Sequence, residues 1–234
     1  MSARLYAVGV GPGDPELLTL KGARLIREAD VVVTPVGDRS DASIAASIIE
    51  DLVDPARQQL LTQVYPMKRD QGGLEQSWAE SAAEVAELVR RGKTVVFITL
   101  GDPFLYSTFL YLHRQLRENF SDIPVEVVSG VSSINAAAAV AGIPLGLSDE
   151  RLAVLPATYE DEELARTLEA FDTVVLMKVH RVFSRIRELL LRAGLLEKAV
   201  YVKRVGLPGE AVIRSLDEVR EEDLNYLSMV IVKK

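Results

Sequence analysis

A glycine-rich turn near the start of the chain constrains the fold more than any other feature. The segment GVGPGD, Gly9–Asp14, continues the apolar stretch Leu5–Val10 and precedes the helical pattern of Glu16–Glu28. Glycine adopts backbone angles closed to other residues and lets a ligand approach the main chain closely. Such a strand-to-helix turn is typical of ligand-binding α/β proteins, although a plain tight turn fits it as well. It is not a dinucleotide fingerprint, because Asp14 stands where G-x-G-x-x-G requires its third glycine.

Strand and helix patterns alternate along the rest of the chain. The run Thr94–Leu100 is apolar throughout, as expected of a central parallel strand that is covered on both faces. The run Leu74–Arg91 predicts a long amphipathic helix that ends at Gly92. Near the C-terminus, Ala211–Arg214 and Tyr226–Lys233 predict two strands with no helix between them, so we expect a mixed sheet there.

The pattern therefore predicts two α/β domains, with a parallel-type sheet in the N-terminal one and a mixed sheet in the C-terminal one. The polar segment Asn119–Pro124 marks the expected boundary, which gives domains of residues 1–119 and 120–234. Further strands are expected at Val31–Val33, Val125–Val128, Leu152–Leu155, Thr173–Met177 and Ala199–Lys203, and further helices at Ala42–Leu52, Ser107–Glu118, Ser132–Ala141, Glu162–Ala170 and Val182–Ala193.

Composition excludes several kinds of site. There are no cysteines, so disulfides, thiolate metal sites and a cysteine nucleophile are ruled out. The two histidines, His113 and His180, lie far apart in sequence, and we expect no metal site. No apolar run is long enough to span a membrane and the N-terminus lacks a signal-peptide pattern, so a cytoplasmic location with no membrane partner is expected. A net charge of −7 argues against a nucleic-acid partner but leaves room for a local basic pocket.

Two further glycine turns follow predicted strands. They are GDPFLYST, Gly101–Thr108, and SGVSS, Ser129–Ser133. Ligands bind at the carboxyl ends of strands in open α/β sheets, which is where all three turns are expected. Asp102 is compatible with a turn-forming or helix-capping role and with accepting hydrogen bonds from ribose hydroxyls or an amino group. Ser132 and Ser133 are likewise compatible with helix caps and with ligand contacts.

Together, GVGPGDPELLTL, TLGDPFLYST and SGVSS resemble the tetrapyrrole methylase family, the class III S-adenosylmethionine-dependent methyltransferases. The resemblance runs from Leu5 to the last strand. LSDERLAVLPA (Leu147–Ala157), DTVVLMKVHR (Asp172–Arg181) and the ending YLSMVIVKK are similar to the branch that acts on precorrin-2 or cobalt-factor II. This implies methylation of the C-20 meso carbon of that tetrapyrrole in cobalamin biosynthesis, with cobalt either present or absent in the substrate.

The resemblance also implies a homodimer with its active site in the cleft between the domains. S-adenosylmethionine would bind there and leave as S-adenosylhomocysteine, and no protein-bound metal is expected. The residues implied to bind the cofactor are Pro12, Leu100, Gly101, Asp102, Leu105, Tyr106, Ser132, Ser133, Met177 and Val205. No residue stands out as the base that removes the proton from the methylated carbon, so the catalytic residues stay unassigned.

Two positions depart from the family pattern. Ser129-Gly130 stands where the family often has Pro-Gly, which makes the placement of Ser132 less firmly defined. Pro35 stands where uroporphyrinogen methylases carry an Asp credited with moving protons. Proline has no acid–base chemistry, so this position argues for a different tetrapyrrole substrate.

A corrin precursor carries many carboxylates, so an acidic protein needs local positive charge to bind it. Candidate substrate-binding residues are Lys68 and Arg69, and Lys178 and Arg181 beside His180. Lys203–Arg204, at the end of another predicted strand, forms a third basic pair. Each of these charges is also compatible with a solvated strand end.

Three other functions remain open. The chain could be a family member that methylates another ring carbon, or one that acts outside tetrapyrrole synthesis as a diphthine synthase or ribosomal RNA ribose methylase. It could also be a non-catalytic dimeric binding module. An RNA methylase requires an extended basic surface, which the net negative charge of the chain disfavours.

Overall fold

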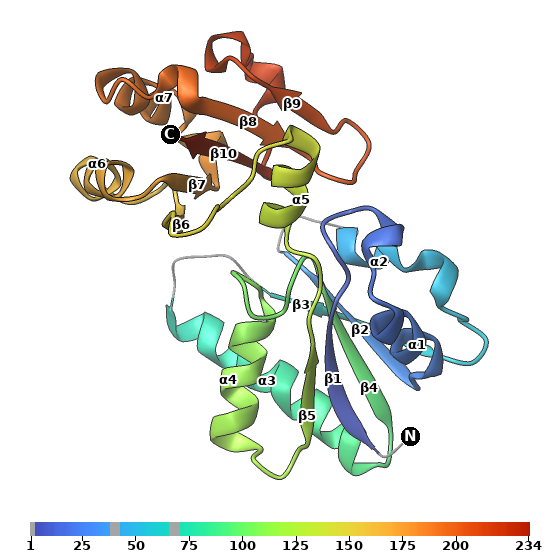
Figure 1. The fold of residues 1–234 in the computed structure, drawn as a ribbon. Coiled ribbons are helices and arrows are strands. Elements are labelled where there is room, and N and C mark those ends of the chain that lie inside the picture. Colours follow the sequence, from blue (N-terminus) through green and yellow to red (C-terminus); the bar gives the residue numbers. More distant parts are fainter. Residues whose placement is uncertain (1–2, 38–42, 66–70) are drawn as a thin grey trace. The chain divides into compact units, whose positions relative to one another are not determined.

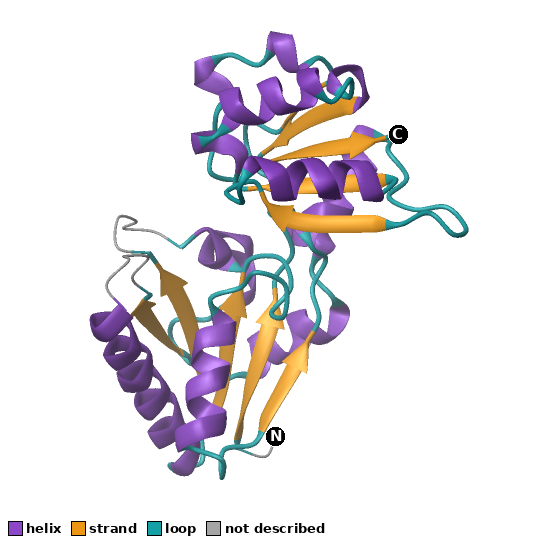
Figure 2. Cartoon of the chain, turned by 90° about the vertical axis from the view of Figure 1, so that its left-hand side faces the viewer, coloured by secondary structure: helices purple, strands orange, loops and turns teal. Residues whose placement is uncertain are grey.

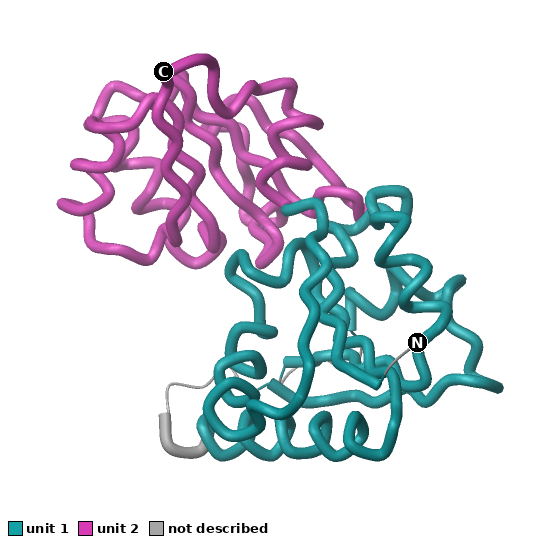
Figure 3. The backbone as a smooth tube through the Cα atoms, turned by 60° about the horizontal axis from the view of Figure 1, so that its bottom comes forward, with its two compact units in different colours: residues 1–132 teal, residues 133–234 magenta. Residues whose placement is uncertain are grey.

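The computed structural model describes residues 3–37, 43–65 and 71–234. It divides the chain into two compact units, Met1–Ser132 and Ser133–Lys234 (Figure 3). Each unit contains one five-stranded sheet with helices packed against it, which confirms the predicted α/β class with a parallel N-terminal and a mixed C-terminal sheet.

The sheet of the first unit is parallel throughout, with the strand order β3-β2-β4-β1-β5 (Figure 1). Strand β1 therefore lies between β4 and β5, and Leu5 pairs with Val95 on one side and Val125 on the other. The strands are β1 Arg4–Gly9, β2 Val31–Val36, β3 Gln59–Val64, β4 Thr94–Thr99 and β5 Val125–Val128.

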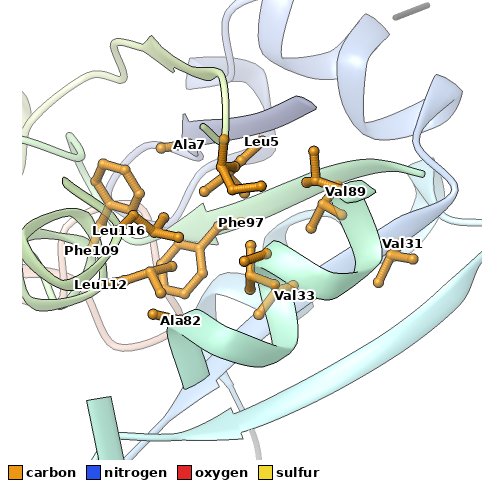
Figure 4. Packing of buried hydrophobic residues seen from close by; sticks show 14 of the residues in the cluster. Leu5, Ala7, Val31, Val33, Ala82, Val89, Phe97, Phe109, Leu112 and Leu116 are labelled. Atoms are coloured by element: carbon orange, nitrogen blue, oxygen red, sulfur yellow. The ribbon is translucent and has the colours of Figure 1, made fainter. Parts of the chain in front are cut away.

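Helices cover both faces of this sheet (Figure 2). Odd-numbered residues of β4, such as Phe97, pack against α3 and α4, where Ala82, Phe109 and Leu112 lie around them (Figure 4). Even-numbered residues, such as Ile98, pack against α1 and α2. Burial on both faces explains why β4 is apolar throughout. The helices are α1 Leu20–Glu28, α2 Ile44–Ile48, α3 Gln71–Arg90 and α4 Phe109–Asn119, with 3₁₀ turns at Pro15–Leu17 and Glu50–Leu52.

The second unit has a mixed sheet with the order β6-β7-β10-β8-β9. Strand β6 is parallel to β7, whereas β10 is antiparallel to both of its neighbours, β7 and β8. The strands are β6 Leu152–Pro156, β7 Thr173–Met177, β8 Ala199–Lys203, β9 Ala211–Ile213 and β10 Ser228–Lys233, and the helices are α5 Ser133–Ala141, α6 Asp161–Ala170 and α7 Phe183–Arg192. Short 3₁₀ turns lie at Val179–Arg181, Leu196–Lys198, Leu216–Glu218 and Glu221–Asp223. Among the described residues, no helix combines the length and the apolar character needed to cross a membrane.

The units divide at Ser132–Ser133, later than the expected boundary after residue 119. The polar segment before β5 is a turn within the first unit, because β5 pairs with β1 and completes the first sheet. A polar turn between two elements of one sheet has the same composition as a linker, so composition alone does not distinguish the two.

Three other elements differ from expectation. The predicted helix Glu16–Glu28 is divided, because the Thr19 hydroxyl accepts from the Gly22 N–H at 3.0 Å and begins α1 there. Strand β3, which the sequence did not reveal, is an edge strand with exposed apolar side chains. Pro35 lies inside β2, and pairing of β2 with β4 ends at Val33 while pairing with β3 continues. Proline cannot donate to a ladder, which accounts for the early end on the β4 side.

Candidate functional site

The three glycine turns lie at the carboxyl ends of three adjacent parallel strands. They follow β1, β4 and β5, and β1 is the middle strand of the three. From β1 the chain crosses to β2 on the far side of β4, whereas from β4 it crosses to β5 on the far side of β1. The connections thus leave in opposite directions, which makes the carboxyl ends of β1 and β4 a topological switch point. Open α/β sheets bind their ligands at such points.

The turns contact one another through the main chain. A Cβ on Gly130 would lie 2.2 Å from the Gly101 carbonyl oxygen and 2.7 Å from the Gly9 carbonyl carbon. A Cβ on Gly9 would lie 2.5 Å from the same Gly101 oxygen. The Gly101 N–H also donates to the Gly11 carbonyl at 2.8 Å. Glycine is required at positions 9 and 130, because a Cβ at either would run into the main chain of a neighbouring turn. Gly11 and Gly101 have positive φ angles of 81° and 71°, which favour glycine.

Asp102 joins the second turn to the third. Its Oδ2 accepts from the Gly130 N–H at 3.0 Å, and its Oδ1 accepts from the Phe104 N–H at 2.9 Å. The turn-forming role considered from the sequence is therefore present. A carboxylate offers about four acceptor positions, so Asp102 retains capacity for a ligand hydroxyl or amino group. The bond to Gly130 also fixes the third turn even though serine replaces proline at position 129.

The other first-unit candidates surround this junction. Pro12 is buried in the first turn, and Leu100 is half-buried directly after β4. Leu105 and Tyr106 are 39% and 45% exposed, so both offer apolar surface at the carboxyl edge of the sheet. Tyr106 has a left-handed backbone with φ 52°, which is uncommon for a bulky residue and typical of functional turns.

The serine candidates lie at the junction between the units along the chain. Ser132 is buried and ends the first unit, and Ser133 is the first residue of α5. Both positions suit capping of α5, and a helix N-terminus also favours anionic ligand groups.

A second set of candidates gathers at one edge of the second sheet. Strands β7 and β8 are both antiparallel to β10, so they run in the same direction and their carboxyl ends share an edge. This carboxyl edge of the second sheet carries Met177 at the end of β7 and Lys203 at the end of β8. The residues that follow, Lys178 and Arg204, both have left-handed backbones, with φ 59° and 53°.

Apart from Ser133 in α5, the sequence candidates of the second unit lie at or directly after this edge. Met177 is half-buried and pairs with Met229, and its carbonyl accepts from the Ala157 N–H at 2.7 Å. Val205 is buried, whereas Lys178 and Arg181 are exposed on either side of Val179.

His180 lies between these two basic residues. Its ring packs edge-on against Tyr226, with centroids 5.5 Å apart, and its Nδ1 is buried with no hydrogen-bond partner among the described residues. Burial lowers the pKa of His180, and the positive charge of Arg181 lowers it further. The imidazole is therefore neutral near neutral pH and adds no positive charge to the edge.

Lys203 has a structural partner. Its Nζ lies 2.7 Å from Asp223 Oδ1, and the two side chains are only 16% and 18% exposed. The hydrogen bond from Lys203 and one from the Arg220 N–H lower the pKa of Asp223. The remaining basic candidates, Lys68 and Arg69, lie outside the described residues. Within residues 3–37, 43–65 and 71–234, no cluster of three or more His, Asp or Glu is placed to hold a metal ion.

Comparison with known proteins supplies the family. Residues 4–219 match the model of the Tetrapyrrole (Corrin/Porphyrin) Methylases. The chain belongs to this family. It is 38% identical to a cobalt-precorrin-2 C(20)-methyltransferase of Salmonella typhimurium, over 100% of this chain and 98% of the relative. It is 35% identical to a precorrin-2 C(20)-methyltransferase of a Sinorhizobium species, over 98% of this chain and 94% of the relative.

One similar solved structure contains a bound ligand. The uroporphyrin-III C-methyltransferase of Thermus thermophilus, complexed with S-adenosylhomocysteine, superposes with a TM-score of 0.67 at 26% identity. The superposition covers 99% of this chain and 97% of that protein. The family is S-adenosylmethionine-dependent, so this chain is a methyltransferase by family membership.

The residues of the first sheet's carboxyl edge fit S-adenosylmethionine chemically. Asp102 has acceptor capacity for ribose hydroxyls or the ammonium group. Leu105 and Tyr106 offer exposed apolar surface of the kind that packs against an adenine ring or an S-methyl group. The glycine turns bring main-chain donors and acceptors to the same edge.

Proposed function

We propose that this methyltransferase acts on the C-20 meso carbon of precorrin-2 or its cobalt-containing form, in cobalamin biosynthesis. The observation that carries the proposal is the similarity, at 35–38% identity over nearly the whole of both chains, to relatives named for that reaction. Pro35 supports it, because this chain lacks the Asp that the resemblance assigns to uroporphyrinogen methylases.

For the cofactor, we propose that the first unit contributes Pro12, Leu100, Gly101, Asp102, Leu105, Tyr106 and Ser132, and the second contributes Ser133, Met177 and Val205. The convergence of the three turns through Gly9, Gly101 and Gly130 supports the first group. The shared carboxyl edge of β7 and β8 supports Met177 and Val205. Ser133 is supported by its place directly after Ser132, at the N-terminus of α5.

The bound cofactor supplies an electrophilic methyl group on its sulfonium. The chain's own contribution is to hold the meso carbon in line with that methyl group and to exclude water. Such placement contributes roughly 7–11 kcal/mol to lowering a barrier when the reacting groups are well oriented. The macrocycle's conjugated nitrogens make the meso carbon electron-rich, so the protein needs no metal of its own for this step.

The substrate's carboxylates require positive charge on an acidic protein. We propose Lys178 and Arg181 for this role, together with Lys68 and Arg69. Lys178 and Arg181 flank His180 at the carboxyl edge of the second sheet, and both are exposed. Arginine suits carboxylates because its guanidinium donates two parallel hydrogen bonds.

We also propose that the chain acts as a cytoplasmic homodimer with no nucleic-acid partner. The exposed apolar side chains of Leu110 and Tyr111 on α4 support self-association. Light scattering of the purified chain would report twice the monomer mass if this is right and the monomer mass if it is not.

The test of the proposed function is incubation with S-adenosylmethionine and precorrin-2, with and without cobalt. We expect one methyl group to be added, with NMR placing it at C-20, and one S-adenosylhomocysteine released per methyl. Methylation at another ring carbon would indicate a sibling activity. Binding of S-adenosylhomocysteine without turnover of either tetrapyrrole would indicate a binding module.

A further inference from the structure

Several arginines of the second unit form an ion pair with a nearby Asp or Glu. Each of the following has a carboxylate oxygen within ion-pair distance: Arg151, Arg185, Arg187, Arg192 and Arg220. Lys203 is neutralised in the same way by Asp223. Among the described residues, the arginines of this unit without an ion pair are Arg166, Arg181, Arg204 and Arg214. Of these, Arg181 and Arg204 lie at the carboxyl edge shared by β7 and β8, whereas Arg166 lies in α6 and Arg214 follows the antiparallel strand β9.

Arg204 is also held in a fixed arrangement. Its N–H donates to the Leu227 carbonyl at 2.7 Å, and its Nε donates to the Pro208 carbonyl at 2.6 Å. Gly209 lies against the same side chain, since a Cβ there would be 3.5 Å from Arg204 Nε. The guanidinium is thus anchored at Nε, while Nη1 and Nη2 have no hydrogen-bond partner among the described residues.

The position of Arg204 matches that of Lys178. Each residue directly follows a strand, each has a left-handed backbone, and their strands lie on either side of β10. Neighbouring strands are about 4.8 Å apart, so the two basic residues start from main-chain positions roughly 10 Å apart. Arg181 lies in the 3₁₀ turn after Lys178. A ligand with several carboxylates, spaced around a ring, suits such a row of positive charges.

We infer that Arg204 binds a peripheral carboxylate of the tetrapyrrole through its Nη1 and Nη2 donors, and so is a substrate-binding residue distinct from the cofactor contacts. The inference rests on the proposed function for the identity of the substrate. Anchoring at Nε reduces the rotamer entropy lost on binding, and a guanidinium end matches a carboxylate with two hydrogen bonds. Lys203, its neighbour in sequence, is committed to Asp223 and does not share this role.

The test compares Arg204→Gln and Arg204→Lys with wild type and with Arg166→Gln. Arg166 is an exposed residue of α6, so the control removes the same charge elsewhere in the unit. Arg204→Gln should raise the KM for precorrin-2 about tenfold, because charged hydrogen bonds are lost, and leave kcat and the Kd for S-adenosylhomocysteine within about twofold. Arg204→Lys should give a smaller rise, because it keeps the charge without the fork.

A KM unchanged in Arg204→Gln, or a Kd for S-adenosylhomocysteine raised by the same factor, would overturn the inference. Melting temperatures of all variants check that they fold. If Arg204→Gln does not fold, the KM of Arg204→Lys is compared with that of wild type in its place. Should wild type fail to methylate precorrin-2, the proposed function fails separately. Uroporphyrin, a stable octacarboxylate, then serves as the probe: weaker binding to Arg204→Gln than to Arg166→Gln upholds a carboxylate site, and equal binding refutes it.

Discussion

The carboxyl edges of the two sheets are built in opposite ways. In the first unit the three turns at this edge meet through main chain, and neither Gly9 nor Gly130 has room for a Cβ beside the Gly101 carbonyl. In the second unit the edge is made of side chains, and Lys178 and Arg204 take left-handed angles that glycine would adopt more easily. Substitutions at the first edge should therefore lower the stability of the fold. Substitutions at the second edge should weaken substrate binding and leave the fold intact.

The largest effect is expected where the three turns meet. Gly130→Ala places a Cβ 2.2 Å from the Gly101 carbonyl oxygen, so main chain must move. We expect a loss of more than about 3 kcal/mol in the free energy of unfolding, together with loss of S-adenosylhomocysteine binding. Trp78, the chain's single tryptophan, lies in α3 and reports unfolding of the first unit by fluorescence.

Gly146→Ala is the matched control, since the nearest atom to its added Cβ is 4.0 Å away. It should change stability by no more than about 0.5 kcal/mol. Equal stability of Gly130→Ala and wild type would contradict the main-chain junction.

Asp102→Asn should have the next largest effect. The amide keeps one acceptor and turns a donor toward a main-chain N–H, so either Gly130 or Phe104 loses its partner. Leaving such a donor unsatisfied costs about 1–3 kcal/mol of stability. We also expect the Kd for S-adenosylhomocysteine, measured by calorimetry, to rise about tenfold because the proposed ligand acceptor is weakened. Asp51→Asn, at an exposed position, should change neither quantity.

The second edge should separate substrate from cofactor. Arg181→Ala combined with Arg69→Ala should raise the KM for the tetrapyrrole several-fold, by roughly 1 kcal/mol, while cofactor affinity stays nearly constant. Steady-state kinetics with each substrate varied in turn would measure this. Equal losses in both affinities would place these charges outside a substrate-specific role.

The smallest effect is expected on stability, from the ion pair between Lys203 and Asp223. Because Lys203 lowers the pKa of Asp223 below its ordinary 3.8, the pair stabilises the fold above that pH and the stabilisation is lost as pH falls through the folded-state pKa. Asp223→Asn should lower the Tm at pH 7, by circular dichroism, and this deficit should shrink toward pH 3. A deficit that is independent of pH would show that the carboxylate charge is not its cause.

The comparison also explains how far the sequence could be read. Glycine turns after apolar strands are local patterns, so Gly9–Asp14 and Gly101–Thr108 could be placed correctly at strand ends. The contact of Gly9 with Gly130 joins residues remote in sequence, and spacing along the chain does not encode it. For the same reason the sequence could not separate Lys203 from Arg204, since only the fold brings Asp223 to one of them. Strand β3 escaped prediction because an exposed edge strand lacks a buried face to pattern its residues.

The central claim is that the three turns of the first sheet's carboxyl edge bind the methyl donor. A crystal structure of the purified chain with S-adenosylhomocysteine tests it most directly. The account predicts ligand density against Pro12, the Gly101–Tyr106 turn and Ser132, with an Asp102 oxygen accepting from the ligand. Density confined to another surface, with these turns untouched, would contradict it.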